Sequence, residues 1–211
     1  MTDKRVMTVC GPVAPETLGV TSMCDHIFHD GAGWYGKAAT TAETETARLF
    51  PVRGEDKVRL DNVGILHRNT FLARDATRQD GEAAMARELA LFRQAGGGAV
   101  LDASVAGNCL GGAGALRRIS EQTGVHVVAS AGFCAGDAWP DAPRGLDLAG
   151  CCDRLRQEAE RGLGDTGVRP GCLKLLLGGL DEDGEQALRA GARVSLETGL
   201  LLVLRFMKAE D

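Results

Sequence analysis

Three residues of this 211-residue sequence stand out for the chemistry that their side chains could do. The first two, Cys24 and His26, flank Asp25 at the end of an apolar run that is typical of a strand. Side chains two positions apart on a strand point to the same face, so a thiol and an imidazole would lie side by side, as metal ligands do. The alternative is a small buried thiol beside a hydrogen-bonded histidine, which the spacing by itself favours. His29 is a further candidate ligand, but its position favours the following loop.

The third residue is Lys174, which lies inside the aliphatic run from Cys172 to Leu177. A charged amine costs much free energy to bury, and burial lowers the pKa of a lysine toward its neutral, nucleophilic form. Such an amine can form a Schiff base, or it can take up carbon dioxide and become a carbamate that binds metal ions through two oxygens. A shorter strand that leaves Lys174 at a solvent-exposed end is equally compatible with the sequence.

A glycine-rich stretch from Gly107 to Gly114 lies between a predicted strand and a predicted helix, where a dinucleotide loop would hold phosphate. Its spacing is not GxGxxG, and the strand that ends at Phe133 carries no acidic residue for a ribose. We therefore interpret the stretch as a loop that lines a pocket. The sequence also contains no nucleophile elbow, HExxH motif or Walker loop.

The elements that must position these residues alternate strictly between strand and helix. Apolar runs predict strands at 18–26, 99–105, 126–133, 171–177 and 200–206, and helical periodicity predicts helices at 82–95, 113–122, 148–161 and 185–197. Asp80 is placed to cap the first helix. Nearly continuous aliphatic strands with helical crossovers indicate a parallel sheet, in either an open doubly wound fold or a (β/α)8 barrel. Residues 31–61 have no clear period and predict a long loop, with a short helix near 41–49.

Composition narrows the classes of partner. The 24 basic and 29 acidic residues give a net charge of −5, and no run of Lys or Arg occurs, so we expect no nucleic-acid partner. No apolar stretch approaches the ~20 residues that span a bilayer, and no signal peptide is visible, so we expect no membrane partner. The 7 cysteines include no CxxC pair, which indicates reduced thiols in a cytoplasmic protein.

Several segments, taken in order and register, resemble the phosphotriesterase family of the amidohydrolase superfamily, which includes the phosphotriesterase-related proteins. Their spacing matches from about residue 6 to residue 205, nearly the whole chain. Many short matches in one order make a stronger case than any single motif. The segments are Val9–Val13, Leu18–Thr21, Asn62–Gly64, Gly96–Asp102, Thr123–Val128, Gly132–Phe133, Gly162–Lys174 and Glu197–Gly199.

The resemblance implies a (β/α)8 TIM barrel with two divalent metal ions, usually zinc, at the C-terminal ends of the strands. In that family a metal-bound hydroxide attacks a phosphoester, lactone or amide of a small-molecule substrate. The His-x-His of the first strand corresponds to Cys24 and His26, and the metal-bridging carboxylated lysine corresponds to Lys174. We expect Trp34 and Phe133 to contact the substrate.

The chain departs from the family pattern at several positions. Cys24 replaces a histidine, Arg205 stands where the fifth strand should carry another, and the Arg-Asp expected after the second strand is missing from the glycine-rich loop. Five predicted strands leave no residues for three more before Asp211. Since catalytic zinc generally takes three protein ligands, we expect at most one ion, held by Cys24, His26 and Lys174.

These observations lead to an expected α/β fold with one phosphotriesterase-like domain over residues 1–211, an incomplete TIM barrel with about five of its eight βα units. The expected function is that of a zinc-dependent hydrolase of impaired activity. The alternative is a catalytically inactive half-barrel that acts as a binding or oligomer-forming module. The open edge at 200–204 predicts homo-oligomers or aggregation, since an exposed strand edge pairs with other chains.

Overall fold

Parallel strands that follow one another in chain order form the centre of the fold. The computed structural model describes residues 4–31, 52, 54–105, 112–134, 143–178 and 180–206. One sheet contains β3 (Val20–Asp25), β6 (Gly97–Asp102) and β7 (His126–Val128), and a second contains β8 (Ser130–Cys134), β9 (Cys172–Leu177) and β10 (Leu201–Phe206). Ala129 alone separates β7 from β8 in the sequence, so the third predicted strand is present in two segments.

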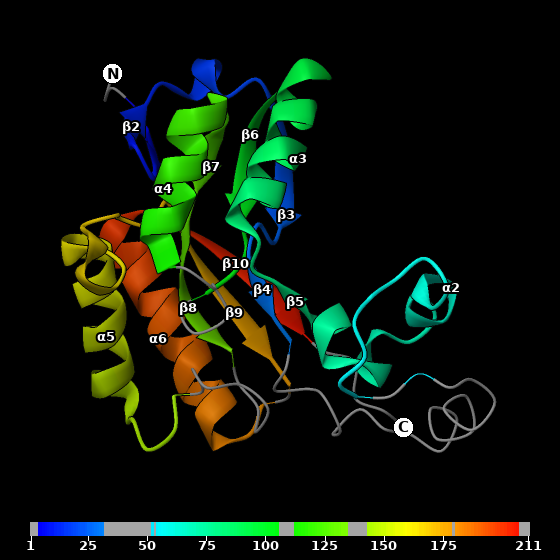
Figure 1. Cartoon of the computed structure of the whole chain (residues 1–211). Coiled ribbons are helices and arrows are strands. Elements are labelled where there is room, and N and C mark those ends of the chain that lie inside the picture. Colours follow the sequence, from blue (N-terminus) through cyan, green and yellow to red (C-terminus); the bar gives the residue numbers. More distant parts are fainter. Residues whose placement is uncertain are drawn as a thin grey trace.

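Helices cover one side of these strands, as Figure 1 shows. They are α3 (Glu82–Gln94), α4 (Gly112–Thr123), α5 (Leu148–Arg161) and α6 (Glu182–Thr198). Helices α3 and α4 pack with β6 and β7 around one apolar core, and α5 and α6 pack with β8 and β9 around another. The predicted α/β fold with parallel strands is confirmed, and the sequential strand order is that of a (β/α)8 barrel rather than of a doubly wound sheet.

Smaller elements flank the parallel strands. Strands β1 (Val6–Thr8) and β2 (Gly11–Val13) form an antiparallel hairpin, and β4 (His29–Asp30) pairs antiparallel with β5 (Arg78–Gln79). The short helix α2 (Val63–Leu66) extends away from the sheets in Figure 1. Short 3-10 helices among the described residues lie at Pro15–Thr17, Thr70–Leu72, Arg74–Thr77 and Gly164–Thr166. The helix expected near 41–49 lies outside the described residues.

The inner face of the sheets is identified by the residues of β9. Leu173, Leu175 and Leu177 pack against α5 and α6. Because side chains alternate along a strand, Lys174 therefore points to the opposite, inner face. On that face Cys172 packs with residues of β6 and β7, which joins the two sheets.

Three details of the predicted elements are corrected. Asp80 does not cap α3, because Gly81 is the N-cap residue and Asp80 instead forms an ion pair of 3.2 Å with Arg78. Helix α6 begins at Glu182, earlier than predicted, because the side chain of Asp181 accepts a hydrogen bond from a backbone N–H of its first turn. Strand β6 begins two residues early, at Gly97, because the chain approaches its neighbour closely: a Cβ on Gly98 would lie 2.0 Å from a backbone oxygen.

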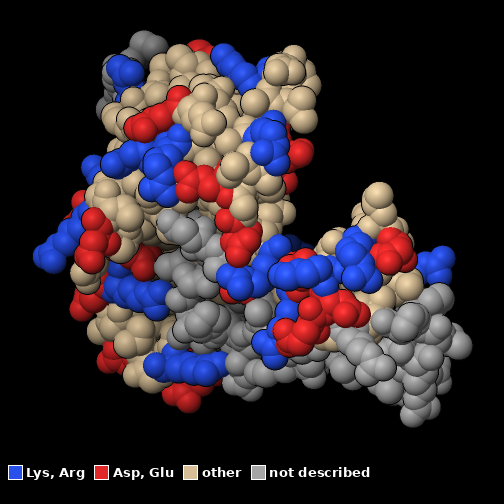
Figure 2. All heavy atoms as spheres, viewed as in Figure 1, with Lys and Arg blue, Asp and Glu red and all other residues tan. Residues whose placement is uncertain are grey.

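The two outer strands of the described fold, β3 and β10, expose large apolar side chains. Val20 and Met23 of β3 are 67% and 57% exposed, and Leu201 and Phe206 of β10 are each 55% exposed. Figure 2 shows acidic and basic side chains intermixed over one face of the molecule. Among the described residues, no helix has the length and apolar character that crossing a membrane requires.

Candidate functional site

Lys174 lies in the middle of β9 and is buried, with only 3% of its surface exposed. Its Nζ donates a hydrogen bond to the carbonyl oxygen of Ala103, at 2.8 Å. Burial lowers the pKa of Lys174, although the neighbouring thiols of Cys24 and Cys134 act in the opposite direction. The amine therefore loses its proton more readily than that of a surface lysine, and the solvent-exposed alternative for this residue is wrong.

His26 follows β3 directly and is partly buried. Its Nδ1 lies 2.8 Å from the Oγ of Ser104, in the segment after β6. Burial, reinforced by the positive charge of Lys174, lowers the pKa of His26 from 6.5 to about 4. The ring is therefore neutral at neutral pH, and a neutral imidazole has a lone pair that can bind a metal ion or accept a proton.

Cys24 lies two residues before His26, and it is exposed. The register of β3 against β6 is irregular between Ser22 and Asp25, so Met23 and Cys24 together lie opposite a single residue of β6. Such a bulge changes the direction of the side chains within it. The thiol of Cys24 is close enough to Lys174 to affect the pKa of that amine.

Arg205 comes from β10 and lies on the same face as Lys174. It pairs with Leu176 in the parallel register of β10 and β9, while Val203 pairs with Lys174, so Arg205 is one side-chain step nearer to the C-terminal end. Its positive charge contributes to lowering the pKa of both His26 and Lys174. A cation is therefore present where the resemblance expects a metal-binding histidine.

These side chains from β3, β9 and β10 form one electrostatically coupled cluster at the C-terminal ends of the strands, where barrel enzymes carry their active sites. His29, in β4, also belongs to it, because its ring centroid lies 5.3 Å from that of His26. Burial lowers the pKa of His29 as well. The ring of His29 therefore lies beside His26, and its Nε2 is 3.0 Å from the position of a Cβ on Gly31, where the following loop begins.

Sequence reasoning missed one titratable residue next to this cluster. Asp102, the last residue of β6, has no exposed surface, and burial raises its pKa from 3.8 to about 6, although hydrogen bonds from Ser104 oppose that shift. Its Oδ1 accepts a hydrogen bond of 2.7 Å from the backbone N–H of Ser104, while its Oδ2 has no hydrogen-bond partner among the described residues. The one signal in the sequence is its place at the end of an apolar strand.

Of the two residues expected to contact substrate, the structure describes Phe133, which does not lie in the cluster. Phe133 has no exposed surface and packs in the core between β8–β9 and the helices, with the guanidinium of Arg154 5.0 Å from its ring centroid. Its ring therefore offers no accessible surface to a substrate. Trp34 lies outside the described residues.

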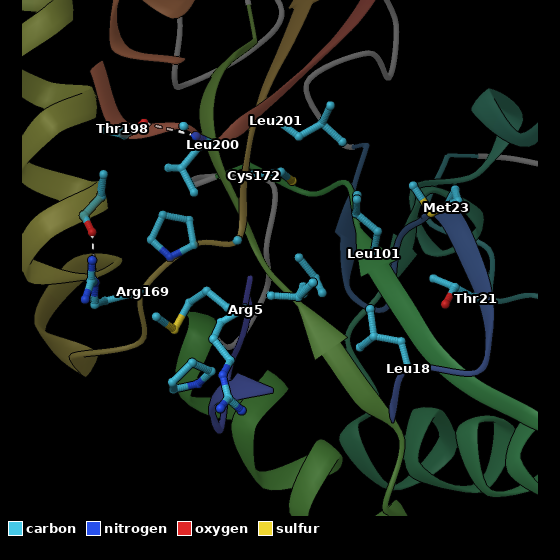
Figure 3. A pocket seen from close by; sticks show the side chains of 18 of the residues that line it. Arg5, Leu18, Thr21, Met23, Leu101, Arg169, Cys172, Thr198, Leu200 and Leu201 are labelled. Carbon is cyan, nitrogen blue, oxygen red and sulfur yellow. Dashed lines mark hydrogen bonds between the residues drawn. The ribbon is translucent and has the colours of Figure 1, made fainter. Parts of the chain in front are cut away.

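A cavity of about 640 Å³ lies at the opposite, N-terminal ends of the strands (Figure 3). Thr21 and Met23 line it on the β3 side, and Leu200 and Leu201 line it on the β10 side. A complete TIM barrel fills this interior with side chains from all of its strands. We interpret the cavity as the unfilled inner part of the barrel between its two outer strands, separate from the cluster around Lys174.

The cluster does not fit the two divalent ions that the resemblance implies. No three His, Cys, Asp or Glu side chains within the described ranges form a group that could hold a metal ion, and Arg205 adds positive charge. For the single ion expected from the sequence, Cys24 carries a sulfur, His26 a nitrogen and Lys174, once carboxylated, two oxygens. Three such ligands are the number that catalytic zinc generally takes.

Comparison with known proteins gives consistent matches. A sequence model of the Phosphotriesterase family matches residues 4–206. The N-acetyltaurine hydrolase of Tetraodon nigroviridis is 28% identical over 169 residues, and that of Rattus norvegicus is 26% identical over 170 residues; each match covers 80% of this chain and 46% of the relative. The N-acetyltaurine hydrolase of Homo sapiens is 23% identical over 203 residues, which is 95% of this chain and 56% of the relative.

A solved structure shows the same architecture. The crystal structure of a resiniferatoxin-binding protein from Rhodobacter sphaeroides superimposes with a TM-score of 0.83 and 28% sequence identity, over 95% of this chain and 54% of that one. The chain spans about half the length of the curated relatives and of the solved structure that it matches. The described residues therefore have a TIM-barrel-like fold, matched over about half of that solved structure.

Proposed function

Since the chain belongs to the phosphotriesterase family, we propose that it acts as a metal-dependent hydrolase on phosphoester, lactone or amide bonds of small molecules, with an activity that its altered ligand set impairs. The observation that carries this proposal is the buried Lys174, coupled at the strand ends to the neutral ring of His26. A buried lysine with a lowered pKa, facing a histidine and a cysteine, is typical of a reactive site rather than of a structural core.

Formation of the proposed site begins with carboxylation of Lys174. The neutral amine attacks carbon dioxide, a nitrogen–carbon bond forms, and the amine loses one proton to water. The product is a carbamate with one negative charge and two oxygens. Burial favours this reaction, because it supplies the neutral amine at a lower pH than a surface lysine would.

The carbamate of Lys174, with Cys24 and His26, would hold at most one divalent ion, which we propose to be zinc. Such an ion polarises the scissile bond and lowers the pKa of water. The residues of this chain provide its ligands, and Arg205 keeps a positive charge beside them. We propose that this charge takes the place of the second ion of the family.

Among the candidate substrates we favour N-acyl amides that carry an anionic group. The curated relatives are named N-acetyltaurine hydrolases, and taurine carries a sulfonate. Hydrolysis adds water across the amide, breaks the carbon–nitrogen bond and releases a carboxylate and an amine. The guanidinium of Arg205, exposed on β10, fits the negative charge of such a substrate.

A second candidate function is that of a non-catalytic half-barrel which binds or assembles with other chains. The exposed apolar side chains on both outer strands favour it. We further propose that residues 1–211 form one phosphotriesterase-like domain with five of the eight βα units. Free cysteines among the described residues, including the exposed Cys10 and Cys24, support a reducing, cytoplasmic location.

Hydrolysis of N-acetyltaurine, an aryl ester, a lactone and a phosphotriester, assayed with and without added zinc, tests the proposal. We expect zinc-dependent hydrolysis of the amide, and a loss of kcat/KM of at least roughly ten-fold in His26→Asn, because metal sites lose about that much even from changes to the residues around their ligands. His67→Asn is the matched control, since His67 is exposed beyond α2. No turnover of any substrate would favour the half-barrel, and equal rates of hydrolysis in the two variants would contradict the role of His26.

A further inference from the structure

The segments that follow β3 and β6 are joined by a small hydrogen-bond network with Ser104 at its centre. Ser104 is buried, with 4% of its surface exposed. Its Oγ donates to the carbonyl oxygen of Phe28 at 2.9 Å, and the same Oγ lies 2.8 Å from Nδ1 of His26. Its backbone N–H donates to Oδ1 of Asp102 at 2.7 Å. One serine therefore connects the candidate ligand His26 to both strands.

The hydrogen atoms of this network can be assigned by counting donors. A serine hydroxyl has one hydrogen, and a carbonyl oxygen only accepts. The hydrogen of Ser104 is therefore given to Phe28, and its Oγ must accept a hydrogen from Nδ1 of His26. A neutral imidazole carries one N–H, so Nε2 of His26 is left without hydrogen and with its lone pair available.

From this geometry we propose that Ser104 is a positioning residue, which holds His26 in the Nδ1–H tautomer so that Nε2 faces the chemistry of the site. The proposal deepens the proposed function, because it rests on that function for what Nε2 binds. The tautomer itself is independent of any activity. Free histidine in water prefers the opposite, Nε2–H, tautomer. A hydrogen bond in the protein therefore has to offset the free-energy difference between the two tautomers.

The rest of the network keeps Ser104 in place. Oδ1 of Asp102 holds its backbone, and the Oγ of Ser130 in turn donates to the backbone oxygen of Asp102 at 2.5 Å. On the other side, Nε2 of the Gln79 side chain donates to the backbone oxygen of His26 at 2.9 Å. Both partners of the His26–Ser104 hydrogen bond are thus held by neighbours, which is how partners behind a metal ligand fix its orientation.

Nitrogen NMR of the metal-free full chain tests the proposal directly. The chain has 4 histidines, so a sample labelled with 15N-histidine gives few signals, and His29→Gln, His67→Gln and His126→Gln assign them by elimination. We expect a pyrrole-type shift for Nδ1 and a pyridine-type shift for Nε2 of His26. In Ser104→Ala we expect the Nδ1 shift to move toward the pyridine type and the Nε2 shift toward the pyrrole type. In Ser104→Thr, which keeps the hydroxyl, we expect the shifts of the parent.

A matched control separates tautomer choice from general damage. Ser120 is also buried, and its Oγ donates to the backbone oxygen of Val125 at 2.7 Å, a hydrogen bond that does not involve His26. Ser120→Ala should destabilise the chain to a similar degree and leave the His26 shifts unchanged. A parent protein with the hydrogen on Nε2, or a Ser104→Ala variant with the parent pattern, would overturn the proposal. Because the parent measurement alone can overturn it, a failure of Ser104→Ala to fold does not remove the test.

Zinc titration gives a second readout that distinguishes this proposal from the proposed function. Loss of a hydrogen bond behind a metal ligand typically weakens metal binding by roughly ten- to a hundred-fold, which we expect for Ser104→Ala and not for Ser120→Ala. A parent chain that binds no zinc but shows the Nδ1–H tautomer would contradict the proposed function and support the role of Ser104. A parent chain that has the Nε2–H tautomer before metal is added, and that then binds zinc, would contradict the role of Ser104 and support the proposed function.

Discussion

Nζ of Lys174 and the carbonyl oxygen of Ala103 are hydrogen-bonded at 2.8 Å, although the strand made of β7 and β8 lies between β9 and β6. Two strands that are separated by a third lie about 9.5 Å apart in the hydrogen-bonding direction of a flat sheet. The lysine side chain therefore crosses the inner face over the intervening strand. This contact fixes the amine beside the segment that carries Ser104 and follows β6.

The first prediction concerns the carbamate of Lys174. In buffer with 13C-labelled bicarbonate, the parent chain should show a carbamate carbon signal by NMR, because burial lowers the pKa of the Lys174 amine. Lys174→Met should lose the signal. Lys57→Met should retain it, since Lys57 is exposed and its hydrogen bond with Asp75 raises its pKa. A signal that survives in Lys174→Met would contradict carboxylation at this residue.

The second prediction concerns pH and Asp102, whose pKa burial raises from 3.8 to about 6. A raised pKa means that the folded chain disfavours the carboxylate, so Asp102 lowers stability progressively as pH rises through this interval. A shift of that size corresponds to about 3 kcal/mol at full ionisation. The unfolding free energy of Asp102→Asn minus that of the parent should therefore rise by about that amount between acidic and neutral pH.

Denaturant unfolding of the parent and of Asp102→Asn across that range checks the prediction. The difference between the two proteins isolates Asp102, because every other titrating group, His26 included, is common to both. A part of this difference that is the same at every pH reflects only the hydrogen bonds that the amide changes. A difference that stays flat with pH would mean that Asp102 is ionised in the fold as easily as in water.

The third prediction concerns Gly132, which pairs with Lys174 across β8 and β9. Its φ is +149°, and a Cβ built on it would lie 1.7 Å from the carbonyl oxygen of Lys174. Gly132→Ala must push the two strands apart, and we expect a loss of at least about 3 kcal/mol of unfolding free energy. Gly64→Ala, in α2 with no atom within 4 Å of its Cβ position, should change stability little, and equal effects of the two substitutions would contradict the close approach.

The fourth prediction concerns the outer strand β10. Among the described residues β10 pairs only with β9, and its Leu201, Leu204 and Phe206 are exposed, so we expect the chain to form oligomers or to aggregate. Leu204→Lys should shift the distribution toward monomer in light scattering, because charges on an edge strand oppose pairing with another chain. Leu60→Lys, at a position that is 97% exposed and away from the strands, should not. A parent chain that is a monodisperse monomer with cooperative unfolding would contradict this prediction.

Much of the fold could be predicted because the aliphatic runs form strands that alternate with helices, as the run around Lys174 illustrates. The order of the strands followed from the family resemblance. The segmentation of the third strand at Ala129 could not be predicted, because an alanine continues the apolar pattern of the run.

The candidate site was predictable only in part, for reasons of side-chain geometry. Lys174 is conspicuous because a cation interrupts an aliphatic strand. Asp102 and Ser104 look like ordinary residues at the end of a strand, and their roles depend on hydrogen bonds to segments far away in the sequence. Phe133 lies in a strand where alternate residues face opposite sides, so its type could not tell which side it faces.

Among the described residues, one large apolar core is shared by α3, α4 and the first sheet, and another by α5, α6 and the second. Each core can act as a cooperative unit of unfolding, and such units often open separately. Cys24 and His26 belong to the first unit, while Lys174 and Arg205 belong to the second. The reactive groups meet only when the two units are docked. Mild denaturant or heat should therefore separate the two units and disrupt the site while most helices and strands are still intact.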